Sequence, residues 1–262
     1  MAQRDTIKAR RKKILAYLEE QGRADVSELA QFVGSTDATV RRDLFYLENK
    51  KQLIRTHGGA VRHEQKKPIW QTSPIAGRLE KNKERKMSIG EFAATLIKDD
   101  ESIMVDGGST TQIFSSYLKN HHNLLVVTNS PGIAEILLNN ETARIIQIGG
   151  ELIRDTYQIA GVDAEKHLGR YYVDKSIISV SGADPHYGCY SAIPTEASIK
   201  RTMIEHSRES ILLIDSSKFE RKALCFTFPF SEIDIVVTDS GISRHDAELI
   251  MQQGAILHIV DV

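Results

Sequence analysis

Five short clusters of glycine, hydroxyl and charged residues in the second part of the chain have the composition of an anion-binding site. Glycines let the backbone approach an anion closely, while Ser and Thr hydroxyls and the N–H groups at the start of a helix donate hydrogen bonds to it. A ligand that carries a phosphate and hydroxylated carbons would satisfy these groups. The clusters are Asp106-Gly107-Gly108-Ser109-Thr110-Thr111, Thr128-Asn129-Ser130, Gly149-Gly150, Ser181-Gly182-Ala183-Asp184 and Asp215-Ser216-Ser217-Lys218.

Each cluster also has a simpler interpretation when it is taken alone, because glycines after strands serve tight turns and Ser or Thr often caps a helix. The clusters favour a ligand site only as a set. The first of them matches neither of two common phosphate-binding loops. No Lys follows Gly107–Thr111 at the place that a Walker A loop requires, and the dinucleotide pattern G-x-G-x-x-G is absent there.

Short apolar strands alternate with helices from about Leu79 onward, which predicts a mainly parallel sheet covered on both faces. Ligands of such sheets bind beyond the carboxyl ends of the strands, where the clusters stand. We expect strands at Ser102–Val105, Leu124–Thr128, Arg144–Ile148, Lys175–Val180, Ser210–Ile214, Ile233–Thr238 and Ile256–Val260. The expected helices are Asn82–Ile97, Thr111–Leu118, Ile133–Leu138, Thr195–His206 and Ser243–Gln253.

The first sixty residues predict a different unit, in which two short helices joined by a turn at Gly34-Ser35 form a helix-turn-helix. Thr36 is the expected N-cap of the second helix, which carries Arg41 and Arg42 on or beside the face opposite its apolar residues. The start of such a helix can meet phosphates, and its arginines can reach guanine edges or phosphates. This arrangement is typical of a helix that enters the major groove of DNA.

A strand and a glycine turn follow at Leu53–Val61 and predict a wing that carries Arg55 and His57. Residues 1–66 hold 14 Lys and Arg against 9 Asp and Glu, whereas the remaining 196 residues hold 20 against 26. A basic head on an acidic body favours a nucleic-acid-binding unit joined to a domain of another kind. The alternative interpretation of the charge alone is a solvated basic helix at a terminus.

The chain of 262 residues suits two domains of unequal size. We place a winged helix-turn-helix at 1–61, a polar, proline-containing linker at 62–78 and an α/β domain at 79–262. No apolar run approaches the ~20 residues of a membrane helix, and the polar start predicts no signal peptide. Two cysteines, Cys189 and Cys225, fit a reducing cytoplasm, and no histidine stands at zinc-binding spacing. We therefore expect no metal and no cofactor.

The sequence resembles the DeoR family of bacterial transcriptional repressors over nearly its whole length. The first domain matches at Glu28-Leu29-Ala30, Thr39-Val40-Arg41-Arg42-Asp43-Leu44 and Arg55-Thr56-His57-Gly58-Gly59-Ala60. The second matches at Asp106-Gly107-Gly108-Ser109-Thr110-Thr111, Thr128-Asn129-Ser130, Gly149-Gly150, Gly161, Asp215-Ser216-Ser217-Lys218-Phe219 and Thr238-Asp239. The combination of arginine helix, wing and sensor motifs is specific to this family.

The resemblance implies an α/β fold in which a winged helix-turn-helix precedes a larger sensor domain similar to ribose-5-phosphate isomerase. It implies a homodimeric or homotetrameric repressor of a carbohydrate-catabolism operon, which leaves double-stranded operator DNA when a phosphorylated sugar binds. The implied DNA contacts are Thr36, Asp37, Thr39, Arg41, Arg42, Arg55, Thr56 and His57. The expected effector contacts are Asp106, Gly107, Gly108, Ser109, Thr110, Thr111, Thr128, Asn129, Gly149, Gly150, Gly182, Asp184, Glu196, Asp215 and Lys218.

Two other classes of function stay open at this stage. A sugar-phosphate isomerase with an attached DNA module would need a general base and an acid near the sugar, for which Asp184, His186, Glu196 and Asp215 are available. Similarity of fold does not by itself grant activity, so we expect no enzyme. A sensor whose main partner is another protein is the third class, and the basic head counts against it.

Overall fold

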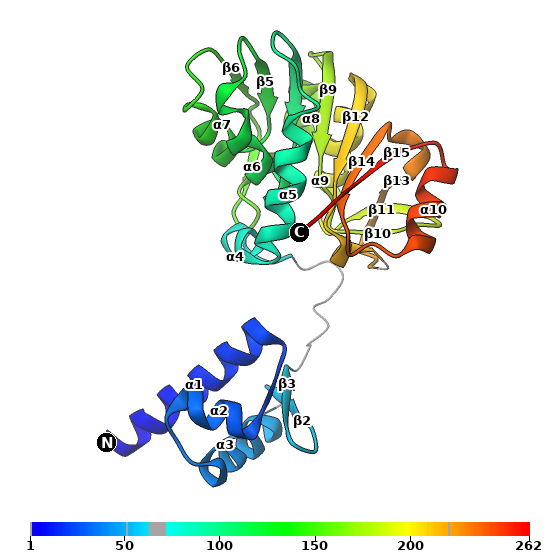
Figure 1. Ribbon diagram of the computed structural model, residues 1–262. Coiled ribbons are helices and arrows are strands. Elements are labelled where there is room, and N and C mark those ends of the chain that lie inside the picture. Colours follow the sequence, from blue (N-terminus) through cyan, green and yellow to red (C-terminus); the bar gives the residue numbers. More distant parts are fainter. Residues whose placement is uncertain (1, 51, 63–71, 220) are drawn as a thin grey trace. The chain divides into compact units, whose positions relative to one another are not determined.

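The computed structural model describes residues 2–50, 52–62, 72–219 and 221–262. The chain divides into two compact units, Met1–Lys67 and Pro68–Val262, and each has its own hydrophobic core (Figure 1). Arg62 is the last residue of a strand and a helix begins at Ile75. Regular structure therefore extends into both ends of the segment 62–78, which we expected to be a linker.

The N-terminal unit contains three helices and a small antiparallel sheet of strand order β1-β3-β2. The elements are α1 (Ala2–Gln21), β1 (Arg23–Asp25), α2 (Val26–Val33), α3 (Asp37–Asn49), β2 (Leu53–Arg55) and β3 (Gly59–Arg62). A Cβ atom at Gly59 would lie 2.1 Å from the carbonyl oxygen of Ala24. Only glycine therefore allows β3 to pair this closely with β1, a strand that the sequence pattern does not predict.

The turn between α2 and α3 is made by residues suited to the ends of helices. Gly34 ends α2 in the left-handed conformation at φ 64°, where a side chain would be strained. Thr36 caps α3 because its Oγ1 accepts a hydrogen bond of 3.4 Å from the backbone N–H of Thr39. Val40 and Leu44 of α3 are buried against α1 and α2, which turns the opposite side of α3 to solvent.

The C-terminal unit is built on a seven-stranded sheet of order β15-β14-β12-β9-β4-β5-β6, in which every neighbouring pair is parallel. Its strands are β4 (Ser102–Val105), β5 (Leu125–Thr128), β6 (Arg144–Gln147), β9 (Val173–Ile178), β12 (Ser207–Leu213), β14 (Ile235–Asp239) and β15 (Ile256–Val260). From β4 the chain adds β5 and β6 toward one edge of the sheet. It then returns to β9, on the other side of β4, and adds β12, β14 and β15 toward the opposite edge. The order reverses between β4 and β9, and this reversal is the place where open α/β sheets bind ligands.

Helices cover both faces of this sheet, as the strand–helix alternation predicts (Figure 1). Ile103 and Val105 point into the core on the side of α5, while Met104 points into the core on the side of α9. This alternation is the side-chain period of a strand that is buried on both faces. The helices are α4 (Ile75–Glu80), α5 (Lys83–Ala94), α6 (Ser109–Ser116), η1 (Tyr117–Asn120), α7 (Pro131–Leu137), α8 (Val162–Leu168), α9 (Pro194–Glu205), η2 (Ser216–Lys218), η3 (Phe230–Glu232) and α10 (Arg244–Gln252).

Two small antiparallel sheets complete the unit, and neither is expected from the sequence pattern. One is the hairpin of β7 (Glu151–Ile153) and β8 (Gln158–Ala160). The other contains β10 (Gly182–Asp184), β11 (Gly188–Ser191) and β13 (Cys225–Phe228). None of the helices in the described part of the chain combines the length and the hydrophobicity needed to span a lipid bilayer.

Candidate functional site

The carboxylate of Asp106 occupies the point where the strand order reverses. Asp106 directly follows β4, and its Oδ1 accepts a hydrogen bond of 2.9 Å from Nζ of Lys200 on α9. Its Oδ2 accepts hydrogen bonds from the backbone N–H and the hydroxyl of Ser179, at 3.3 and 3.2 Å. Ser179 directly follows β9, so the ends of the two strands are joined through one buried carboxylate.

The glycines after Asp106 serve close packing as well as the turn. The backbone N–H of Gly107 donates a hydrogen bond of 3.0 Å to Oδ1 of Asn129, which follows β5. A Cβ atom at Gly107 would lie 2.4 Å from the side chain of Gln158, and one at Gly108 would lie 1.8 Å from Oγ of Ser179. The sequence motif therefore brings the ends of β4, β5, β8 and β9 together.

The hydroxyl groups of this region fall into two kinds. Those of Thr128 and Thr111 donate to backbone carbonyls, at 2.7 and 2.9 Å, and thus hold the strand ends in place. In contrast, the hydroxyl Oγ1 of Thr110 is buried and has no hydrogen-bond partner among the described residues, and the same holds for the carboxylate Oε1 of Glu196, one turn before Lys200 on α9. Buried polar atoms without partners are costly and rare, so these two atoms are suited to bind a ligand.

The turn after β12 carries a second pair of opposite charges. Nζ of Lys218 lies 3.8 Å from Oδ2 of Asp215, and both side chains are largely buried. Asn82, at the junction of α4 and α5, donates hydrogen bonds of 3.0 Å to Oδ1 of Asp215 and 2.8 Å to Oγ of Ser217. The turn is therefore fixed to the start of α5.

Burial and charge act in opposite directions on this pair. Burial lowers the pKa of Lys218, and the carboxylate of Asp215 offsets only part of that effect. Burial would raise the pKa of Asp215, but the charge of Lys218, the hydrogen bonds from Ser217 and Asn82 and the charge of Lys86 together outweigh it, so that pKa lies below its ordinary value. The charges of Asp106 and Lys200 also act on Lys218, which places the two charged pairs in one electrostatic neighbourhood.

Some of the residues expected in the site have other surroundings. Gly149 and Gly150 lie between β6 and β7, and the N–H of Gly149 donates a hydrogen bond of 3.1 Å to Nδ1 of His167 on α8. Gly182 belongs to β10, which lies beside the Lys218 turn through a bridge between Ala183 and Phe219. Asp184 pairs with the exposed Lys222 at 3.1 Å.

The sequence interpretation overlooked two residues that complete the polar cluster, Ser179 and Asn82. A local signal existed for Ser179, which stands at the end of an expected strand. The spacing of Glu196 and Lys200, one helical turn apart, predicts either a surface pair or a pair that points toward the ligand edge, and the structure buries both side chains. No local signal identifies Asn82, because its partners are more than 130 residues away in the sequence. Within the described residues, no group of three or more His, Cys, Asp or Glu could hold a metal ion.

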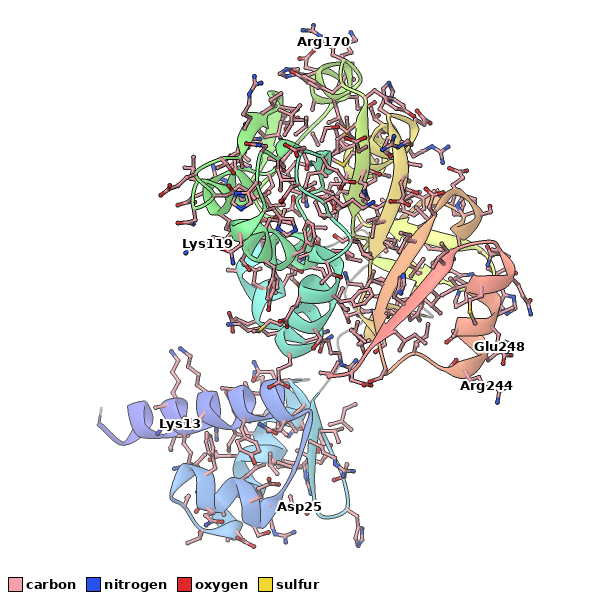
Figure 2. All side chains as sticks on the ribbon, turned by 45° about the horizontal axis from the view of Figure 1, so that its top comes forward. Lys13, Asp25, Lys119, Arg170, Arg244 and Glu248 are labelled. Carbon is pink, nitrogen blue, oxygen red and sulfur yellow. The ribbon has the colours of Figure 1, made fainter. Side chains whose placement is uncertain are left out.

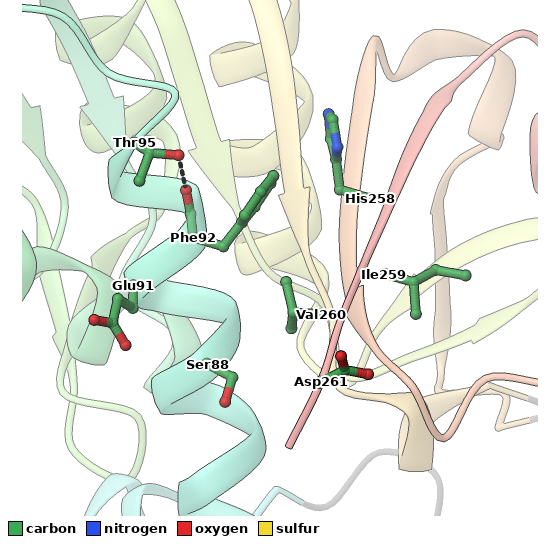
Figure 3. Close-up of a pocket in the computed structure, with 8 residues that line it drawn as sticks. All are labelled: Ser88, Glu91, Phe92, Thr95, His258, Ile259, Val260 and Asp261. Atoms are coloured by element: carbon green, nitrogen blue, oxygen red, sulfur yellow. Dashed lines mark hydrogen bonds between the residues drawn. The ribbon is translucent and has the colours of Figure 1, made fainter.

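A surface groove lies elsewhere, between α5 and the edge strand β15 (Figure 3). Phe92 and His258 face each other across it with ring centroids 4.9 Å apart. The eight described residues that line the groove include Glu91 and Asp261 and contain no Lys or Arg. Its charge is therefore unsuited to an anionic ligand, and the cluster around Asp106 and Lys218 is the stronger candidate site.

The exposed side of α3 is the candidate nucleic-acid interface. Arg41 and Arg42 are exposed, and neither forms an ion pair with another residue in the described part of the chain. Thr36 and Asp37 are exposed at the start of the same helix. Arg55 of β2 is exposed too, but it lies 3.5 Å from Glu48, which neutralises part of its charge. The two free arginines are therefore the main cationic groups of this surface.

A buried ion pair network fixes α3 behind that surface. The carboxylate of Asp43 accepts hydrogen bonds from Nε of Arg10 at 2.6 Å and Nε of Arg11 at 2.7 Å. Both arginines belong to α1, so two of the basic residues in the head stabilise the unit internally. At the start of α2, the Glu28 carboxylate accepts a hydrogen bond of 3.2 Å from the backbone N–H of Asp25, a residue labelled in Figure 2.

Comparison with known proteins agrees with this division of the chain. Residues 10–66 match the DeoR-like helix-turn-helix domain, and residues 81–240 match the DeoR C terminal sensor domain. The chain is 35% identical to the L-fucose operon activator of Haemophilus influenzae, over 87% of this chain and 90% of that protein. It is 31% identical to the glycerol-3-phosphate regulon repressor of Escherichia coli, over 87% of this chain and 88% of that protein.

Among solved structures, ribose 5-phosphate isomerase A from Methanocaldococcus jannaschii aligns with a TM-score of 0.39. The sequence identity is 16%, over 53% of this chain and 55% of that chain.

Proposed function

The chain belongs to the DeoR family of transcriptional regulators, and we propose that it represses a carbohydrate-catabolism operon and leaves the operator when a phosphorylated sugar binds. The proposed DNA contacts are those of the exposed α3 surface and the wing. The protein would act in the cytoplasm as a homodimer or homotetramer, because helix-turn-helix proteins usually pair across two half-sites. Since its named relatives are regulators, we propose binding of the sugar without turnover.

The observation that carries the proposal is the polar cluster at the reversal of strand order. It combines a buried ammonium group, Lys218, with two buried atoms that lack hydrogen-bond partners within the described residues, Oγ1 of Thr110 and Oε1 of Glu196. The ammonium group suits a phosphate, while a carboxylate oxygen without a partner suits a sugar hydroxyl. A neutral sugar would leave the cation without a new partner, which is why we favour a phosphorylated one.

Release of DNA requires that the effector bind the DNA-incompetent state more tightly than the DNA-bound state. A ligand with equal affinity for both states would shift nothing. One of the two relatives is named an activator and the other a repressor, so the names alone do not decide between activation and repression. We propose that this chain is a repressor which its effector releases from DNA. Whether the effector weakens or strengthens the binding of operator DNA tests this proposal directly.

The deciding experiment is a fluorescence anisotropy titration of the full chain onto a DNA fragment from upstream of its own gene. The titration is repeated with a panel of phosphorylated sugars and with each matching unphosphorylated sugar. We expect salt-dependent DNA binding that one phosphorylated sugar weakens at least tenfold while its unphosphorylated counterpart does not. Strengthened binding would contradict induction, and equal effects of both sugars would contradict the phosphate.

A further inference from the structure

We propose that Arg78 of α4 forms part of the effector site and that α4 transmits occupancy of that site toward the DNA-binding unit. This inference rests on the proposed binding of a phosphorylated effector. It concerns a helix outside both the sequence motifs and the strand ends.

An excess of positive charge surrounds Lys218. The charges of Arg78 and Lys218 both act on Lys86, and the charge of Arg78 also acts on Lys218. The carboxylate of Asp215 counters Lys86, but it is already paired with Lys218. The side chain of Arg78 is half-buried and forms no ion pair within the described residues. Asp215 is paired with Lys218 and Asp106 with Lys200, so Arg78 and Lys86 are the cations of this neighbourhood without an ion-pair partner among the described residues, and they leave a place for an anion.

Both ends of α4 are attached to elements of the site. The backbone N–H of Ile75 donates a hydrogen bond of 2.9 Å to the carbonyl of Asp155, in the hairpin that carries Gln158. Near the other end, Nζ of Lys86 donates to the carbonyl of Lys81 at 2.5 Å and to that of Arg78. Lys86 is therefore a positioning residue, which holds the last turn of α4 against α5.

The junction between α4 and α5 is bonded directly to the turn that carries Lys218. Asn82 adopts a left-handed backbone at φ 52°, and its side chain donates to both Asp215 and Ser217. Arg85, one turn later, donates a hydrogen bond of 2.8 Å to Ser216. A displacement of this turn on ligand binding would therefore also displace the junction between α4 and α5. The left-handed residue is a natural place for the change of direction.

The position of α4 in the chain gives these contacts a consequence for regulation. Helix α4 begins at Ile75, shortly after the boundary between the two units at Lys67 and Pro68. Arg78 and Lys218 repel each other because both are positively charged. An anion held between them would attract both side chains and draw α4 toward the turn after β12. The segment that leads to the DNA-binding unit starts from this helix, so its starting point would move with α4.

The test uses the full chain with inorganic phosphate as the probe. Calorimetric titration gives the affinity, and hydrogen exchange of the amides of 75–80 reports on α4. We expect phosphate to bind the parent chain and to slow exchange in α4 several-fold. Arg78→Gln should weaken phosphate binding about tenfold, the effect of one lost charge-assisted contact. The matched control is Arg244→Gln, since Arg244 is almost fully exposed on the outer side of α10 (Figure 2).

The possible results separate this inference from the wider proposal. Equal phosphate affinity of Arg78→Gln and the parent chain would overturn the role of Arg78 and leave the phosphorylated effector standing. Phosphate binding without any change of exchange in α4 would overturn the transmission. Failure of the parent chain to bind phosphate would overturn both this inference and the effector class, while the DNA titration would still test regulation. An unchanged circular dichroism spectrum confirms that Arg78→Gln is folded.

Discussion

Nζ of Lys200 donates a hydrogen bond of 2.9 Å to Oδ1 of Asp106, and both side chains are almost completely buried. The pair joins α9 to the end of β4 and stands where ligands of open α/β sheets bind. A buried charge of either sign is costly without its partner, so the pair fixes the geometry of the site. Its loss should be measurable both in stability and in ligand binding.

We expect Lys200→Met to lower the free energy of unfolding of the C-terminal unit by about 3–5 kcal/mol, because Asp106 would keep a buried charge without its cation. Urea unfolding followed by circular dichroism measures this change. Lys83→Met is the matched control, since Lys83 forms an exposed pair with Glu80 whose removal should cost under about 1 kcal/mol. Equal effects of the two substitutions would show that the buried pair contributes little.

We expect Arg42→Ala to weaken operator binding by about 1–3 kcal/mol and to reduce the salt dependence by about one released counterion. Arg42 is exposed on α3 and has no acidic partner within the described residues. DNA titrations at several salt concentrations measure both quantities. Arg244→Ala, on the surface of the other unit, should change neither. Unchanged affinity of Arg42→Ala would place the DNA contact on another face of the head.

We expect Lys218→Met to bind operator DNA as the parent chain does but to need a roughly tenfold to hundredfold higher effector concentration for release. In the proposed site the buried ammonium group is the main cation for the effector phosphate, and a hydrogen bond to a charged group is worth about 1.5–3 kcal/mol. Lys222→Met tests the specificity of the effect, because Lys222 lies nearby but is exposed and paired with Asp184. Release of Lys218→Met at the parent concentration contradicts the assignment.

The stability of the folded chain should depend on pH through Lys86. Burial lowers the pKa of Lys86 from its ordinary 10.5 to about 8, helped by Lys218, Arg78 and Lys81 and opposed by Asp215. The unfolded chain therefore binds more protons than the folded chain between about pH 8 and 10.5. The contribution of Lys86 to stability must rise with pH across this window. Chemical unfolding measures the free energy of unfolding of the parent chain and of Lys86→Met. The value for the parent chain minus the value for Lys86→Met should rise toward high pH. A difference that does not change with pH would contradict the lowered pKa.

The parallel sheet was predictable because its strands are short apolar runs with clear ends. The expected strands Ser102–Val105 and Ile256–Val260 agree with the structure to the residue. The strands β10, β11 and β13 have three or four residues and no alternating pattern, so their sequences carry little local signal. Helix α4 has only six residues, and its last turn is held by hydrogen bonds from Lys86 of α5 to the carbonyls of Arg78 and Lys81.

The site was predictable only in its motif-bearing part. Asp106 and Lys218 belong to clusters that stand at the ends of strands, and a parallel sheet must bring such ends to one edge. Lys200 is 94 residues away from the Asp106 that it pairs with, and no spacing rule links them. The same holds for Asp43, whose partners Arg10 and Arg11 lie on another helix.

The reversal of strand order also determines when each part of the newly made protein can fold. Asp106 and its partner Ser179 are separated by 73 residues, and Lys218 comes later still. The N-terminal unit has a core of its own and is complete within Met1–Lys67. At a synthesis rate of about 5–20 residues per second, we expect the head to fold roughly 10–30 s before the cluster can assemble. A chain on the ribosome would therefore pass through a period in which its head is folded for DNA binding but the proposed effector cannot yet bind.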